Sequence, residues 1–115
     1  MMQKIITEKI GGKVIIVLQG DVDASDMRLS RRLTSPQSRS LEFNIWIDCS
    51  AVECIKTHGL CHFVNQLLLL KGANVSVMLL GLAEHQQRLL QLLHLDPLFT
   101  IVPDFEEAYQ LVQAS

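Results

Sequence analysis

The sequence has few basic residues, and they do not cluster. Ten lysines and arginines stand against twelve aspartates and glutamates, a net charge of −2, whereas nucleic-acid-binding domains usually carry a basic patch. We therefore expect no nucleic-acid partner. No apolar run approaches the roughly 20 residues that a membrane helix needs, and the first residues lack an apolar signal segment. We expect a cytoplasmic protein without direct membrane insertion.

Cysteines and aromatic residues are also scarce. The three cysteines, Cys49, Cys54 and Cys61, are odd in number and lack the spacing of a secreted disulfide framework. We therefore expect reduced thiols. With only four Phe, one Trp and one Tyr in a chain that is 49% hydrophobic, the core should be mainly aliphatic. A chain of 115 residues can bury one such core, so residues 1–115 are expected to form a single domain.

What the sequence does contain is an alternation of strand and helix patterns. The expected strands are Lys4 to Lys9, Lys13 to Gln19, Phe43 to Cys49, Val75 to Leu80 and Phe99 to Val102, and the expected helices are Ala24 to Leu33, Leu60 to Lys71, Glu84 to His94 and Phe105 to Gln113. Asp23 or Ser25 could cap the first helix, and Asp104 the last.

The order ββαβαβαβα predicts an α/β domain with four helices and a mixed sheet. Strands joined through helices pair in parallel by right-handed crossovers. The Gly11-Gly12 pair between the first two strands favours a tight hairpin turn, which adds one antiparallel strand at the N-terminus. Trp46 lies on the opposite face of its strand from Phe43, Ile45 and Ile47. Because this face also carries a large apolar side chain, we expect both faces of the sheet to be covered.

Several landmarks occur together and in order along this pattern. They are Gly20-Asp21-Val22-Asp23, Ile45 to Ile55, Thr57-His58-Gly59-Leu60, Gly72-Ala73-Asn74-Val75 and Phe105-Glu106-Glu107-Ala108. Together they resemble the STAS domain, named after sulfate transporters and anti-sigma factor antagonists. The resemblance covers nearly the whole chain and implies regulated protein–protein binding rather than catalysis, with no cofactor.

The resemblance also implies a candidate phosphorylation site. In bacterial regulatory members, an anti-sigma factor kinase phosphorylates a hydroxyl residue in an Asp-Ser-Ser/Thr-Gly-Leu motif at the start of a helix. Here the motif reads Lys56-Thr57-His58-Gly59-Leu60. Thr57 falls on the acceptor position, whereas Lys56 replaces the acidic residue and His58 replaces the second hydroxyl.

The Thr57 side chain has two possible roles, a structural one and a regulatory one. A threonine just before a helix often accepts a hydrogen bond from a free backbone N–H, while a phosphate there would add negative charge at a helix N-terminus that favours anions. In the second role the partner is an anti-sigma factor kinase or a related regulator. The expected partner-binding residues are Lys56, His58, Gly59, Leu60, Asp21, Asp23 and His62.

A metal site and an enzyme are weaker alternatives. Cys54, His58, Cys61 and His62 do not repeat the paired spacing of common zinc modules, so we expect no metal. Asp21, Asp23 and Asp48 could form an acidic cluster for a small ligand or for catalysis, but aspartates also commonly hold turns, and no nucleophile with a base is evident. We expect a non-enzyme.

Two further alternatives concern partners. Similar domains serve anion and lipid transporters, so the chain could be a cytoplasmic accessory subunit of a transport system. The leucines of Leu67 to Leu70 and Leu89 to Leu95 are more typical of core than of a ligand pocket. A surplus beyond one helical stripe would leave an apolar patch for a partner, which is compatible with a homodimer.

Overall fold

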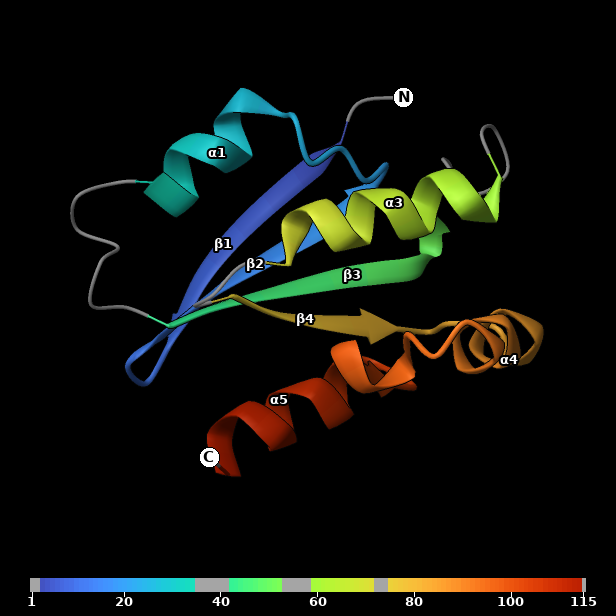
Figure 1. Cartoon of the computed structure of the whole chain (residues 1–115). Coiled ribbons are helices and arrows are strands. Elements are labelled where there is room, and N and C mark those ends of the chain that lie inside the picture. The colour runs from blue at the N-terminus through green and yellow to red at the C-terminus, as the bar shows by residue number, and fades with distance from the viewer. Residues whose placement is uncertain (1–2, 35–41, 53–58, 72–74, 115) are drawn as a thin grey trace.

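The computed structural model describes residues 3–34, 42–52, 59–71 and 75–114. Within these ranges, five strands form one mixed sheet with four α-helices around it (Figure 1). The strands are β1 (Lys4–Ile10), β2 (Lys13–Gly20), β3 (Glu42–Val52), β4 (Val75–Leu80) and β5 (Thr100–Val102). The helices are α1 (Met27–Thr34), α3 (Leu60–Leu70), α4 (Glu84–Leu92) and α5 (Phe105–Ala114), and a 3-10 helix, η2, covers Asp96–Leu98. The predicted α/β class is confirmed.

The strands lie in the sheet in the order in which they occur in the chain, β1-β2-β3-β4-β5. β1 and β2 are antiparallel, and the other neighbours are parallel. The turn between β1 and β2 begins with Gly11 at a φ of 62°, a left-handed conformation that glycine adopts without strain. Because every parallel crossover steps in the same direction, right-handed connections place α1, α3 and α4 on one face.

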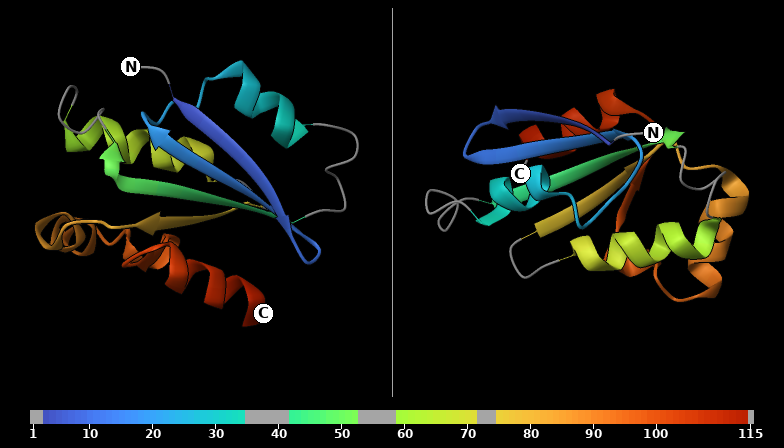
Figure 2. Two further views of the ribbon diagram at one scale, coloured as in Figure 1. Left: turned by 180° about the vertical axis from the view of Figure 1, so that it is seen from behind. Right: turned by 90° about the horizontal axis from the view of Figure 1, so that it is seen from above.

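The larger core lies between that face and the helices. Figure 2 shows α1 and α3 together on one side of the sheet and α5 on the other. Ile16, Ile45 and Val77 pair across β2, β3 and β4 and are buried beneath Phe63 and Leu67 of α3. Helix α3, predicted to begin at Leu60, therefore packs on the sheet through its buried residues Phe63, Val64, Leu67 and Leu70.

The second core is smaller and centres on Trp46. This side chain is 0% exposed, and its ring packs edge-on against Tyr109 at 5.1 Å and tilted against Phe105 at 6.2 Å between centroids. Ala108 and Val112 of α5 complete the contact. The expectation that both faces of the sheet are covered is confirmed, and α5 provides the second cover.

The start of the first helix differs from the prediction. α1 begins at Met27 rather than Ala24, and its cap is Asp26, whose Oδ1 accepts a hydrogen bond from the Arg28 N–H at 2.9 Å. Asp23 and Ser25 instead belong to the preceding turn. In contrast, the cap predicted at Asp104 is confirmed, because its Oδ1 accepts from the Glu107 N–H at 3.0 Å.

Helix α4 ends two residues earlier than predicted, at Leu92. The next turn places His94 at a φ of 59°, where its N–H donates to the Gln91 carbonyl at 3.0 Å and the Leu95 N–H donates to the Leu90 carbonyl at 2.9 Å. This pair of bonds is the Schellman arrangement, which usually has glycine at the left-handed position. A histidine occupies that position here.

Four strands also differ at their ends. β1 and β2 each extend one residue further than predicted, to Ile10 and Gly20, β3 runs from Glu42 to Val52, and β5 begins at Thr100. None of the helices in the described ranges combines the length and the apolarity needed to cross a bilayer.

Candidate functional site

The turn between β2 and α1 is held by its own aspartates. Gly20 leaves β2 at a φ of 84°, and Asp21 Oδ1 accepts from the Val22 N–H at 2.8 Å. Asp23 Oδ1 accepts from both the N–H and the Oγ of Ser25, at 2.9 and 2.6 Å. Such bonds between aspartate side chains and nearby backbone groups fix a turn without regular structure. Val22 is buried in the larger core and anchors the turn to it.

A buried glutamine fixes the same turn from the N-terminal side. Gln3 is only 4% exposed; its Oε1 accepts from the Asp23 N–H at 2.9 Å, and its Nε2 donates to the Asp23 carbonyl at 3.2 Å. Arg28 donates to the Gln3 carbonyl at 2.7 Å and forms a 2.8 Å ion pair with Asp26. The Arg28 hydrogen bond holds the pKa of Asp26 well below its usual range. The β2–α1 turn is therefore a constrained surface.

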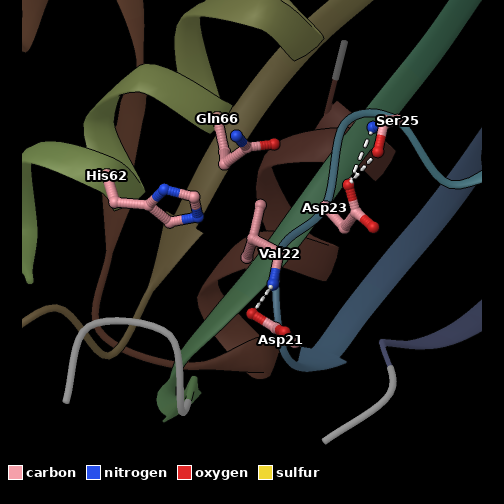
Figure 3. A pocket seen from close by; sticks show the side chains of 6 residues that line it. All are labelled: Asp21, Val22, Asp23, Ser25, His62 and Gln66. Carbon is pink, nitrogen blue, oxygen red and sulfur yellow. Dashed lines mark hydrogen bonds between the residues drawn. The ribbon is translucent and has the colours of Figure 1, made fainter. Parts of the chain in front are cut away.

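The turn is also joined to helix α3. Gln66 Oε1 accepts from the Ala24 N–H at 2.8 Å, across 42 positions of sequence. Figure 3 shows His62 and Gln66 pointing from α3 toward the turn. Between the two segments is a hollow of about 330 Å³, lined by Asp21, Val22, Asp23, Ser25, His62 and Gln66. Three of the predicted partner-binding residues, Asp21, Asp23 and His62, thus share one polar surface, which we call the polar hollow.

The predicted phosphorylation motif is only partly described. Lys56, Thr57 and His58 lie outside the described residues. Gly59 occupies the N-cap position of α3 at a φ of 89°, a conformation that favours glycine. Leu60 begins the helix and is half-buried against the larger core.

Asp48 belongs to a different set of contacts from the other two aspartates of the predicted acidic cluster. Its Oδ2 accepts from Gln19 Nε2 at 3.0 Å, and its Oδ1 accepts from Ser50 Oγ at 2.6 Å. Asp21 and Asp23 line the polar hollow, whereas Asp48 is not among its lining residues. The three carboxylates therefore do not line one pocket.

The other side of α3 faces an apolar groove toward α4. The groove has a volume of about 590 Å³ and is lined by Leu60, Cys61, Val64, Leu89, Leu92 and Leu93. The leucines of α4 were expected to be mainly core, and this is wrong for most of them, since Leu90 is buried whereas Leu92 is 74% exposed. In α3, Leu69 is likewise 67% exposed.

Within the described ranges, no three His, Cys, Asp or Glu side chains gather closely enough to hold a metal ion. Cys61 is exposed, whereas Cys49 is buried.

Two side chains that shape the polar hollow were not predicted, Gln3 and Gln66. Both act on the turn from distant positions in the sequence, 20 and 42 residues away. No local motif marks such contacts. The only sequence signal was indirect: Gln66 lies four residues after His62, which places both on one face of a helix.

The topology of the sheet does not provide the usual ligand position of an open α/β fold. Open α/β sheets bind ligands where the strand order reverses, and this sheet runs in chain order without a reversal. Its distinctive polar surface lies instead between a turn and a helix. The fold is thus a singly wound α/β domain with one antiparallel edge strand.

The family model of the STAS domain matches residues 4–108. The chain therefore belongs to the STAS domain family, as the sequence landmarks predicted. The match spans all five strands and most of the polar hollow's supporting elements.

Proposed function

We propose that this protein is a regulatory binding module that presents the polar hollow and the start of α3 to a protein partner, as an anti-sigma factor antagonist does. The supporting observation is the constrained junction itself. Gln3 fixes the β2–α1 turn, and Gln66 joins that turn to α3. A preorganised surface loses less entropy on binding than a mobile one.

We further propose that Thr57 is the switch of this module. It precedes the N-cap Gly59 by two residues in the sequence. A phosphate adds roughly −1.5 to −2 charges at neutral pH, and the polar hollow already carries Asp21 and Asp23. The added charge would alter the surface that the partner meets without any need to refold the domain.

A role in binding fits the carboxylates of the hollow better than a role in catalysis. Asp21 and Asp23 each use an oxygen to hold the turn, and Asp48, the third carboxylate of the enzyme alternative, bonds to Gln19 and Ser50. A thermal-shift screen with nucleotides, lipids and metals tests the ligand-binding alternative, because a ligand specific to the native state raises its stability.

The experiment for the switch starts with the partner captured and identified from the source cells, and with mass spectrometry of Thr57. Affinity for the purified partner is then measured for the wild type, Thr57→Glu and Thr57→Val. We expect Thr57→Glu to weaken binding by at least about tenfold, through charge, while Thr57→Val binds nearly as the wild type does. Equal affinities for all three proteins would contradict the switch.

A partner that belongs to a membrane transport complex would identify the chain as an accessory subunit of that complex. A transcriptional regulator or its kinase would support the anti-sigma factor antagonist proposal.

A further inference from the structure

The outer edge of β1 is a strand edge that no described element pairs with. β1 is the first strand in the sheet order and pairs on one side with β2. Most of its residues are exposed, and the right-hand view of Figure 2 shows it along one edge of the sheet. An edge strand of this length can pair with another strand through its free backbone groups.

The hairpin fixes which backbone groups point outward. Ile10 and Lys13 flank a two-residue turn and face each other, so they form a hydrogen-bonded pair. Hydrogen-bonded and non-bonded pairs alternate along antiparallel strands. The backbone groups of Ile6 and Glu8 therefore point toward β2, and those of Ile5 and Thr7 point outward.

The side chains of β1 divide between the two faces of the sheet. Glu8 lies on the α5 face, where its Oε2 accepts from the Tyr109 hydroxyl at 2.7 Å. Lys4 and Ile6 are on the same face by the two-residue period of a strand. Ile6 is 40% exposed, a large apolar side chain next to two charges of opposite sign.

We propose that β1 pairs with β1 of a second copy of this chain, antiparallel, about a two-fold axis at Ile6. In this register Ile5 and Thr7 of one copy exchange backbone hydrogen bonds with Thr7 and Ile5 of the other. Ile6 meets its own copy, and Lys4 meets Glu8 at both ends. These side-chain pairs fall at non-hydrogen-bonded positions, where cross-strand side chains approach most closely.

Charge complementarity selects this register over its neighbours. Outward-facing residues must oppose outward-facing residues, so the axis can shift by one residue to Ile5 or Thr7, or by two to Glu8. An axis at Ile5 places Lys4 opposite Ile6 and pairs no opposite charges. An axis at Thr7 places Glu8 opposite Ile6, and an axis at Glu8 places two glutamates together. Lysines normally protect edge strands from pairing, but with the axis at Ile6 each Lys4 meets a carboxylate.

Glu8 is also oriented for this contact. A carboxylate has two oxygens and about four acceptor positions, and the Tyr109 hydroxyl uses one of them. The bond holds the side chain on the α5 face of the edge and leaves acceptor capacity for Lys4 of the second copy.

The test is sedimentation equilibrium of the whole chain from about 10 μM to about 1 mM, the range in which small interfaces associate. We expect a concentration-dependent dimer. Lys4→Glu and Glu8→Lys each place like charges opposite each other at two symmetric positions and should weaken the dimer roughly tenfold. The double variant Lys4→Glu/Glu8→Lys restores opposite charges and should recover the dimer to within about threefold. Tyr109→Phe controls for loss of the hydroxyl bond.

Hydrogen exchange gives a second, independent readout. The Ile5 and Thr7 amides should gain protection as the concentration rises, while the Ile6 amide, already bonded to β2, should not change. A chain that stays monomeric throughout would overturn the proposal. A dimer that ignores the charge exchange but is lost in Leu92→Glu would also overturn it, and would locate the interface at the apolar groove between α3 and α4.

Discussion

Removing the Gln66 side chain tests whether the turn and α3 form one rigid surface. Gln66→Ala leaves the Ala24 N–H without the acceptor that lies 2.8 Å from it. The bond is partly buried, and an unpaired donor in such a place costs about 1–3 kcal/mol. Water can reach part of the polar hollow, so we expect a loss in the lower part of that range, about 1–1.5 kcal/mol of unfolding free energy.

The assay is urea unfolding, with hydrogen exchange of the Ala24 amide as the local readout. The matched control is Asn65→Ala, on the exposed side of the same helix. Alanine is the better helix former in both variants, so propensity alone makes each slightly more stable. A destabilisation at position 66 must then come from the lost contact. If both variants were equally stable and the Ala24 amide kept its protection, the rigid coupling of turn and helix would be refuted.

Two further predictions concern the ends of the helices. His94→Gly should raise the unfolding free energy by about 0.5–1 kcal/mol, because glycine removes the cost of the left-handed φ of 59°. The control, His85→Gly inside α4, should lower the unfolding free energy by about the same amount. If thermal unfolding shifted the stability of both variants in the same direction, this prediction would be contradicted. Asp26→Ala should cost about 1 kcal/mol at neutral pH through loss of the α1 cap. Because the folded pKa of Asp26 lies below its unfolded value, its contribution is present above about pH 4 and is lost on acidification. The difference from the wild type should therefore shrink at pH 3 in urea titrations, and a constant difference would disprove the assignment.

The elements with strong periodic patterns could be predicted from the sequence almost to the residue. The start of α3 at Leu60 and the bounds of β4 at Val75 and Leu80 agree with the structure. In both cases the apolar spacing and the flanking polar or glycine residues point to the same boundary. Local and tertiary preferences coincide in these segments, so contacts with distant residues do not shift the boundaries of these elements.

The start of α1 could not be predicted because three similar capping residues occur within four positions. Asp23, Ser25 and Asp26 are all good N-caps by residue type. The choice among them is made by Gln3 and Arg28, which hold Asp23 in the turn and Asp26 at the helix. A contact across 20 positions has no signature in the local sequence.

The exposed leucines of α4 were mispredicted for a related reason. Leu89, Leu90, Leu92 and Leu93 lie on several sides of a helix, and the sequence does not show which side meets the core. The structure buries Leu90 and leaves the other three at the apolar groove.

Part of the candidate site could also be predicted from the sequence. Asp21, Asp23 and His62 were all expected to bind a partner, and the structure places them around one hollow.

The agreement between strand order and chain order has a consequence for synthesis. Each strand pairs with the one made immediately before it, so the sheet can grow one strand at a time as the chain is synthesised, and each new strand needs only the strand before it as a partner. Trp46 is different, because the helix that covers it, α5, is the last described element. A nascent chain halted before Phe105 would expose that indole, so its tryptophan fluorescence would report whether α5 has been made and has packed against the sheet.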